Sequence, residues 1–110
     1  MNRLTVTVMS LFALPACSIR ASDTLPPFAD IEKATLTFAN CVYQGAKQSA
    51  GRQGTVEELA SEVVARCGEA RSAALDAKSV PVMFQTVEEF DRVHLHVARH
   101  EITESRRNVR

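Results

Sequence analysis

Three cysteines, at positions 17, 41 and 67, constrain the fold of this 110-residue chain more than any other feature. Exported proteins form disulfide bonds because their compartment is oxidising, whereas cytosolic proteins keep their thiols reduced. An odd number of cysteines leaves one without a partner in the chain, so one of the three needs a separate role. A chain of this length forms one domain at most, and small domains often depend on a covalent link.

The beginning of the chain is typical of a secretory signal peptide. Met1-Asn2-Arg3 is a short positive start, and the next 13 residues, LTVTVMSLFALPA, carry no charge. Such a run suits the apolar core of a signal peptide and is shorter than the ~20 residues of a membrane-spanning helix. We therefore predict a signal peptide over residues 1–16. A buried strand is the alternative, since residues 5–8 favour β structure.

The leader ends in Leu14-Pro15-Ala16-Cys17, which resembles the lipobox of bacterial lipoproteins. In that family the cysteine becomes the first residue after cleavage and carries the lipid. The resemblance covers four residues, of which Pro15 is an unusual occupant of its position. It implies that Cys17 is lipidated. Cleavage after Ser18 or Ala21 is the alternative, and it would remove Cys17 with the leader.

Residues 17–27 are mainly polar and contain two prolines, which suits a tether between an anchor and a folded body. We expect residues 28–110 to form that body. The expected location is the periplasm or cell envelope, with membrane attachment through a lipid on Cys17.

Two amphipathic segments carry the other two cysteines. Apolar or small side chains recur at helical spacing over residues 28–50 and again over residues 55 to about 77. Thr55 and Glu58 form a capping-box pattern at the start of the second segment, and two glycines bracket the turn before it. The sequence therefore predicts an antiparallel hairpin of two helices.

In that hairpin Cys41 and Cys67 lie at nearly the same height, because they are about equally far from the turn. Both face the other helix, and Gly45 is expected to meet Val63 beside them. We therefore predict a Cys41–Cys67 disulfide. In the loop-entropy model, closing this loop contributes about 3.5 kcal/mol. A reactive or metal-binding thiol is the alternative, although the chain has no Cys-x-x-Cys pattern.

A third amphipathic segment follows a break at Ser79-Val80-Pro81. Residues 86–89 repeat the capping sequence of residues 55–58, which predicts a new helix start. Residues 93–97 alternate between apolar and histidine side chains, so a strand stays open there as the alternative. We expect residues 105–110 to fray. The predicted fold is all-α, a disulfide-stapled helical hairpin plus a third helix in a small three-helix bundle.

The histidines raise a metal-binding hypothesis. On a helix, His96, His100 and Glu104 share one face at four-residue spacing, and two imidazoles with one carboxylate can hold zinc. The alternative is a solvated polar face, in which the neighbouring Arg92 and Arg99 would repel a metal ion.

Charge and motifs argue against several other functions. Lys and Arg number 13, as do Asp and Glu, so the chain lacks the basic excess that nucleic-acid binding requires. The sequence has no nucleophile elbow, phosphate loop or dinucleotide-binding glycine pattern. The paired acids Glu57-Glu58 and Glu88-Glu89 each open a helix, where the backbone dipole favours negative charge. We therefore predict no enzymatic activity and no cofactor.

Residues 28–77, with two cysteines on neighbouring helices, resemble the small secreted two-cysteine helical proteins of proteobacteria. The resemblance implies a periplasmic location and no known active residues. We expect a non-enzymatic module that binds an envelope protein through its helical surface. The alternatives are a periplasmic metal-binding protein and a stress chaperone whose histidines sense acid. Because the predicted core is thin, we also expect helices to bury surface against a second copy, as a homodimer.

Overall fold

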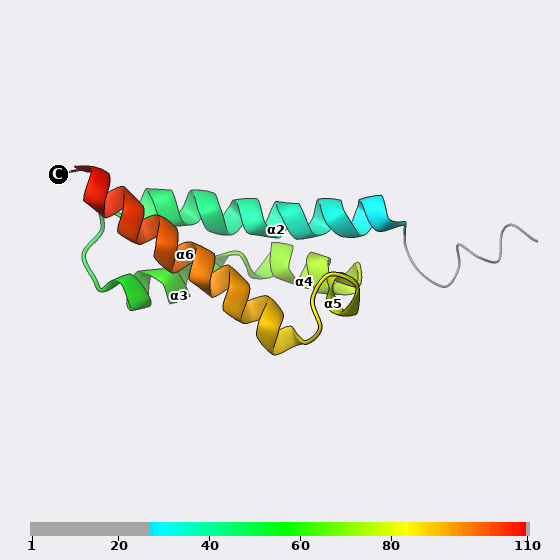
Figure 1. The fold of residues 1–110 in the computed structure, drawn as a ribbon. Helices are drawn as coiled ribbons and strands as arrows, with labels where there is room; N and C mark the ends of the chain where they lie inside the picture. The colour runs from blue at the N-terminus through cyan, green and yellow to red at the C-terminus, as the bar shows by residue number, and fades with distance from the viewer. Residues whose placement is uncertain (1–26, 110) are drawn as a thin grey trace, which may run out of the picture.

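The computed structural model describes residues 27–109, and every regular element in this range is a helix. The predicted signal peptide and Cys17 lie outside the described residues, as does most of the tether. Figure 1 shows the five helices α2 (Phe28–Ser49), α3 (Val56–Arg66), α4 (Gly68–Asp76), α5 (Ser79–Val82) and α6 (Val87–Val109). The predicted all-α class is confirmed, with five helices in the described range where three were predicted.

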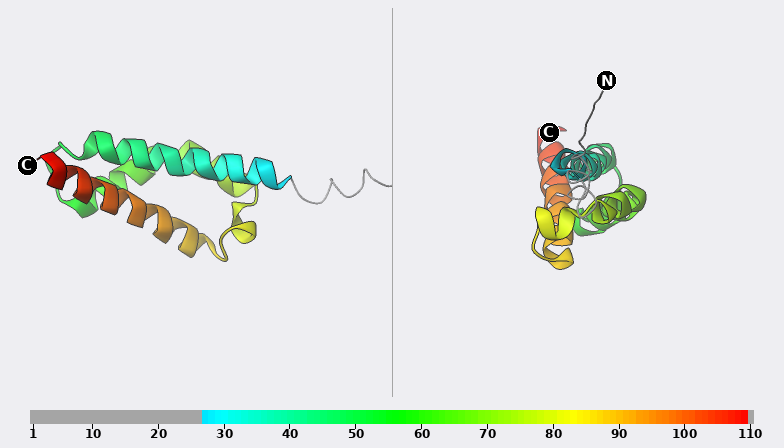
Figure 2. Two further views of the ribbon diagram at one scale, coloured as in Figure 1. Left: turned by 45° about the horizontal axis from the view of Figure 1, so that its top comes forward. Right: turned by 90° about the vertical axis from the view of Figure 1, so that its right-hand side faces the viewer.

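The helices pack around α2, which is contacted by each of the others (Figure 1). α3 and α4 run back along α2 in succession, and α6 lies obliquely across α2 and α3. Where α2, α3 and α6 pack together, their contact faces carry the fully buried small residues Ala46, Ala60 and Ala98. Toward Val87, α6 diverges from α2 (Figure 2), and rings such as Phe38 and Phe90 fill the space.

The predicted second helix is interrupted at Cys67, so the expectation of one continuous helix to about residue 77 is wrong. Cys67 has φ −93° and ψ 23°, and its N–H donates to the carbonyl oxygen of Val64 at 3.1 Å in a tightened last turn. Gly68 follows, and glycine is a weak helix former. The helix therefore ends at Arg66 and restarts at Gly68 in a new helix, α4.

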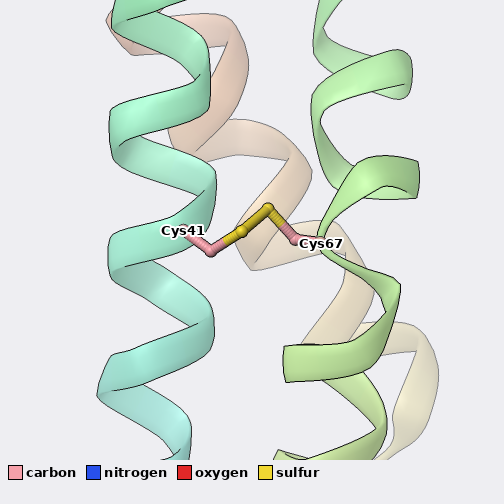
Figure 3. Close-up of a disulfide and its surroundings, with 2 residues drawn as sticks. All are labelled: Cys41 and Cys67. Atoms are coloured by element: carbon pink, nitrogen blue, oxygen red, sulfur yellow. A yellow bond between two sulfur atoms is a disulfide. The ribbon is translucent and has the colours of Figure 1, made fainter.

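The predicted disulfide joins this break to the middle of α2 (Figure 3). The Cα atoms of Cys41 and Cys67 are 6.0 Å apart, which lies within the usual range for a disulfide. Gly45 allows this approach, because a Cβ atom there would lie 3.0 Å from Cγ1 of Val63. The predicted contact between Gly45 and Val63 is confirmed.

Both predicted helix starts are capped as expected. The N–H of Glu58 donates to the Thr55 hydroxyl at 3.0 Å, and the Glu58 carboxylate accepts the N–H of Thr55 at 3.0 Å. At α6, the N–H of Glu89 donates to the Thr86 hydroxyl at 3.0 Å, while its carboxylate accepts the N–H of Gln85 at 2.8 Å. The same local chemistry thus starts α3 and α6.

The end of the chain differs from the prediction of fraying, because α6 continues to Val109. Arg106 explains this order. Its guanidinium donates to the carbonyl oxygens of Ala50 at 2.9 Å, Arg52 at 2.9 Å and Gly54 at 3.0 Å. These carbonyls belong to the turn between α2 and α3, so this one side chain of α6 connects α6 to the end of α2 and the start of α3. Residues 93–97 are helical within α6, which removes the strand alternative.

Two glycine substitutions test the packing at the disulfide. Gly68→Ala should raise the free energy of unfolding by about 0.5 kcal/mol, because its Cβ meets no atom within 4 Å and alanine restricts the unfolded chain. Gly45→Ala should instead lower it by about 1 kcal/mol, because buried, β-branched Val63 resists displacement. Thermal unfolding of both variants measures the difference. An equal gain for Gly45→Ala would contradict the close approach.

Candidate functional site

The most distinctive polar group of the interior is His94 on α6. Its side chain is 3% exposed, and its ring centroid lies 4.3 Å from that of Phe38, 4.7 Å from that of Phe90 and 5.7 Å from that of Phe84. Nδ1 lies 2.7 Å from the carbonyl oxygen of Phe90, which requires Nδ1 to carry the hydrogen and to donate it. We call these four residues the aromatic cluster.

The environment of His94 favours its neutral form. Burial lowers the pKa of the imidazole below its usual value, more than the Phe90 carbonyl and the charge of Asp91 raise it. Asp91 itself accepts two hydrogen bonds of 2.8 Å from Arg71 of α4. This pairing raises the pKa of Arg71, so the guanidinium stays charged. The contacts from α2 and from the segment before α6 are the apolar rings of Phe38 and Phe84.

Arg71 and Asp91 also line an open groove of ≈ 430 Å³. α3, α4 and α6 form it together, and the break at Cys67 places backbone without a side chain, at Gly68, in its wall. The full lining is Ser61, Val64, Ala65, Gly68, Arg71, Asp91 and Leu95. We call it the Gly68 groove. Most of the surface that lines it is apolar, and the ion pair of Arg71 and Asp91 forms part of its wall.

The sequence pattern predicts one helix over residues 55–77, and a continuous helix there would not form the Gly68 groove. It depends on the change of direction after Cys67 and on a pairing between residues twenty positions apart in the chain. The one local signal was Gly68, a glycine inside a predicted helix next to a cysteine. His94 lies four residues after Phe90 in the third amphipathic segment, a spacing that places the two side chains on one face of a helix.

The residues of the metal hypothesis lie on the exposed side of α6. His96 and His100 are brought together, with ring centroids 6.3 Å apart. Glu104 instead pairs with Arg107 at 3.4 Å, and Arg99 pairs with Glu57 at 3.5 Å. These four residues line one surface hollow together with His96 and His100. Within residues 27–109 no three His, Cys, Asp or Glu side chains stand close enough to hold a metal ion. The geometry therefore lends this hypothesis no support.

Comparisons with known protein families, with curated proteins and with solved structures found no match. Among the described helices, none has both the length and the apolar character needed to cross a membrane.

The burial of His94 makes stability depend on pH. In the unfolded chain this imidazole takes up a proton near pH 6.5, while the folded protein keeps it neutral to lower pH. The free energy of unfolding should therefore fall as the pH drops from about 7.5 to about 5.5, by up to about 1.4 kcal/mol per pH unit. Denaturant unfolding at several pH values measures it.

The variant His94→Leu should lose most of this pH dependence, because leucine fills a similar volume and does not titrate. His96→Leu is the matched control, since His96 is exposed on the same helix. An unchanged pH dependence in His94→Leu would show that the acid response has another source.

Proposed function

We propose that this chain is an exported cell-envelope protein that acts as a non-enzymatic protein-binding module. The observation that carries the proposal is the Cys41–Cys67 bridge, which joins α2 to the break between α3 and α4. A disulfide at the centre of so small a core fits an oxidising compartment and is rare in a reducing one. The uncharged segment that follows Arg3 supports the same conclusion independently.

The attachment to the membrane is part of the proposal. With Cys17 lipidated, the two remaining cysteines are those of the bridge, which accounts for the odd count. Residues 17–27 would then connect the lipid to the start of α2. In this proposal α2, the α3–α4 pair and α6 form the three members of one helical bundle. The lipid and the tether keep this bundle close to the membrane.

The Gly68 groove is the binding surface that we assign to the envelope partner. Its apolar lining suits one or two apolar side chains of a peptide segment. Arg71 and Asp91 remain partly exposed, with 32% and 42% of their side-chain surfaces open to solvent. They can therefore offer further donors and acceptors to a partner's backbone without breaking their own pair.

Blocking the groove tests this assignment. Gly68→Leu should fill the groove while leaving the core intact, because a side chain at residue 68 starts in open space. Pull-down from envelope extracts should recover a partner with the unmodified chain and at least tenfold less with Gly68→Leu.

Gly51→Leu is the matched control for this experiment, since a Cβ atom there also meets nothing within 4 Å and lies in the turn after α2. It should retain the partner. Recovery of no partner from either membrane or soluble fractions would contradict the function, and full recovery with Gly68→Leu would contradict the site.

The aromatic cluster favours a second candidate, an acid-responsive chaperone. Protonation of His94 would place a charge among Phe38, Phe84 and Phe90, which loosens α6 from α2 and exposes apolar surface. The charged groups beside it are Asp91 and Arg71, which pair with each other through two hydrogen bonds of 2.8 Å. A client-aggregation assay at pH 7 and pH 5 separates the candidates, because protection that appears in acid and is lost in His94→Leu supports the chaperone. Absence of protection at both pH values removes it.

A further inference from the structure

The outward face of α2 carries an apolar surface that none of the other helices within residues 27–109 covers. Leu36 is 58% exposed and Tyr43 is 39% exposed, although both are large apolar side chains in the middle of a long helix. Glu32, Asn40 and Lys47 are exposed on the same side, and Ala39 is partly buried between them. Their spacing of three or four residues places them in one stripe along the helix. We call these six residues the α2 stripe.

The α2 stripe is self-complementary when a second copy lies antiparallel to it. A two-fold axis between Ala39 and Asn40 brings together positions equally far from that midpoint. Leu36 then meets Tyr43 of the second copy, and Glu32 meets Lys47 of the second copy. Each contact occurs twice, as an isologous interface requires. The small residue Ala39 at the centre lets the two helices approach closely.

A parallel arrangement of the same two helices is unfavourable. In register it would set Glu32 against Glu32 and Lys47 against Lys47, and these like charges repel each other. The charges at the two ends of the stripe therefore select the antiparallel arrangement.

The conformation of the single chain already suits this contact. The Lys47 ammonium lies 5.2 Å from the centre of the Tyr43 ring, so the cation and the ring occupy adjacent positions on the stripe. A shallow hollow of ≈ 390 Å³ flanks Leu36 and is lined by Ala29, Glu32, Lys33, Leu36, Thr37 and Asn40. This hollow can accept the edge of the tyrosine ring of the second copy.

We propose that the α2 stripe is the interface of an antiparallel, two-fold symmetric homodimer. The apolar contact is Leu36 on Tyr43, and the charge pair of Glu32 with Lys47 fixes the direction. The stripe does not include the Gly68 groove, so this inference goes beyond the proposed function and does not depend on it. A monomeric protein could still bind its envelope partner, and a dimer could form without one.

Charge exchange tests the direction of the helices. The disulfide-bonded full chain should sediment as a dimer at high concentration, while Glu32→Lys and Lys47→Glu should each weaken self-association at least tenfold. A mixture of these two single variants should associate again, because each then faces opposite charges at both ends. Dimers of the unmodified chain whose strength is unaffected by either single change would overturn the proposal, as would a mixture that stays monomeric.

A second pair of variants tests the apolar contact. Leu36→Gln should lower dimer affinity at least tenfold, and glutamine keeps the helix because it is a good helix former. Val93→Gln is the matched control, because Val93 is an exposed apolar residue of α6, with 38% of its surface open, and lies outside the stripe. Circular dichroism checks that both variants fold. A monomeric unmodified chain at millimolar concentration, or a dimer insensitive to Leu36→Gln, would refute the interface.

Discussion

The bond between Cys41 and Cys67 is a covalent link across the small helical core. Alanines pack with larger aliphatic side chains, such as Leu59 and Ile102, where α2, α3 and α6 meet, and aromatic rings fill the other end. Small domains of this kind are stable by only a few kcal/mol, so a link that closes a 26-residue separation supplies a large share of the total. The bridge is attached at the residue where α3 stops.

The break in turn shapes the Gly68 groove. After the break, α4 runs in a direction that lets Arg71 donate two hydrogen bonds to Asp91 on α6. Both members of the pair line the Gly68 groove, and the charge of Asp91 also acts on His94 in the aromatic cluster. The α2 stripe shares no residue with the Gly68 groove or with the aromatic cluster. The proposed contact with a second copy is therefore independent of both sites.

Local patterns predicted much of the fold. The apolar spacing predicted the long helices, the Thr-Val-Glu-Glu sequences predicted where α3 and α6 begin, and the position of the cysteines relative to the turn predicted their pairing. The break at Cys67 was missed because the apolar spacing of a helix continues through residue 67. The backbone dihedral angles of Cys67 in the structure show the break. The order of the last turn was also missed, since it depends on contacts of Arg106 with a turn more than fifty residues away. The candidate groove needs both the break and the Arg71–Asp91 pair, so the local signal of Gly68 was not enough to predict it.

The central claim is that the chain folds outside the cell interior around an oxidised Cys41–Cys67 pair. The intact mass of the native protein, purified from membrane and periplasmic fractions, tests it most directly. The account predicts a chain that has lost its leader and lacks the two hydrogens of a reduced pair, with an added lipid mass if cleavage occurs before Cys17. A cytosolic protein that retains Met1 and carries both thiols free would contradict it.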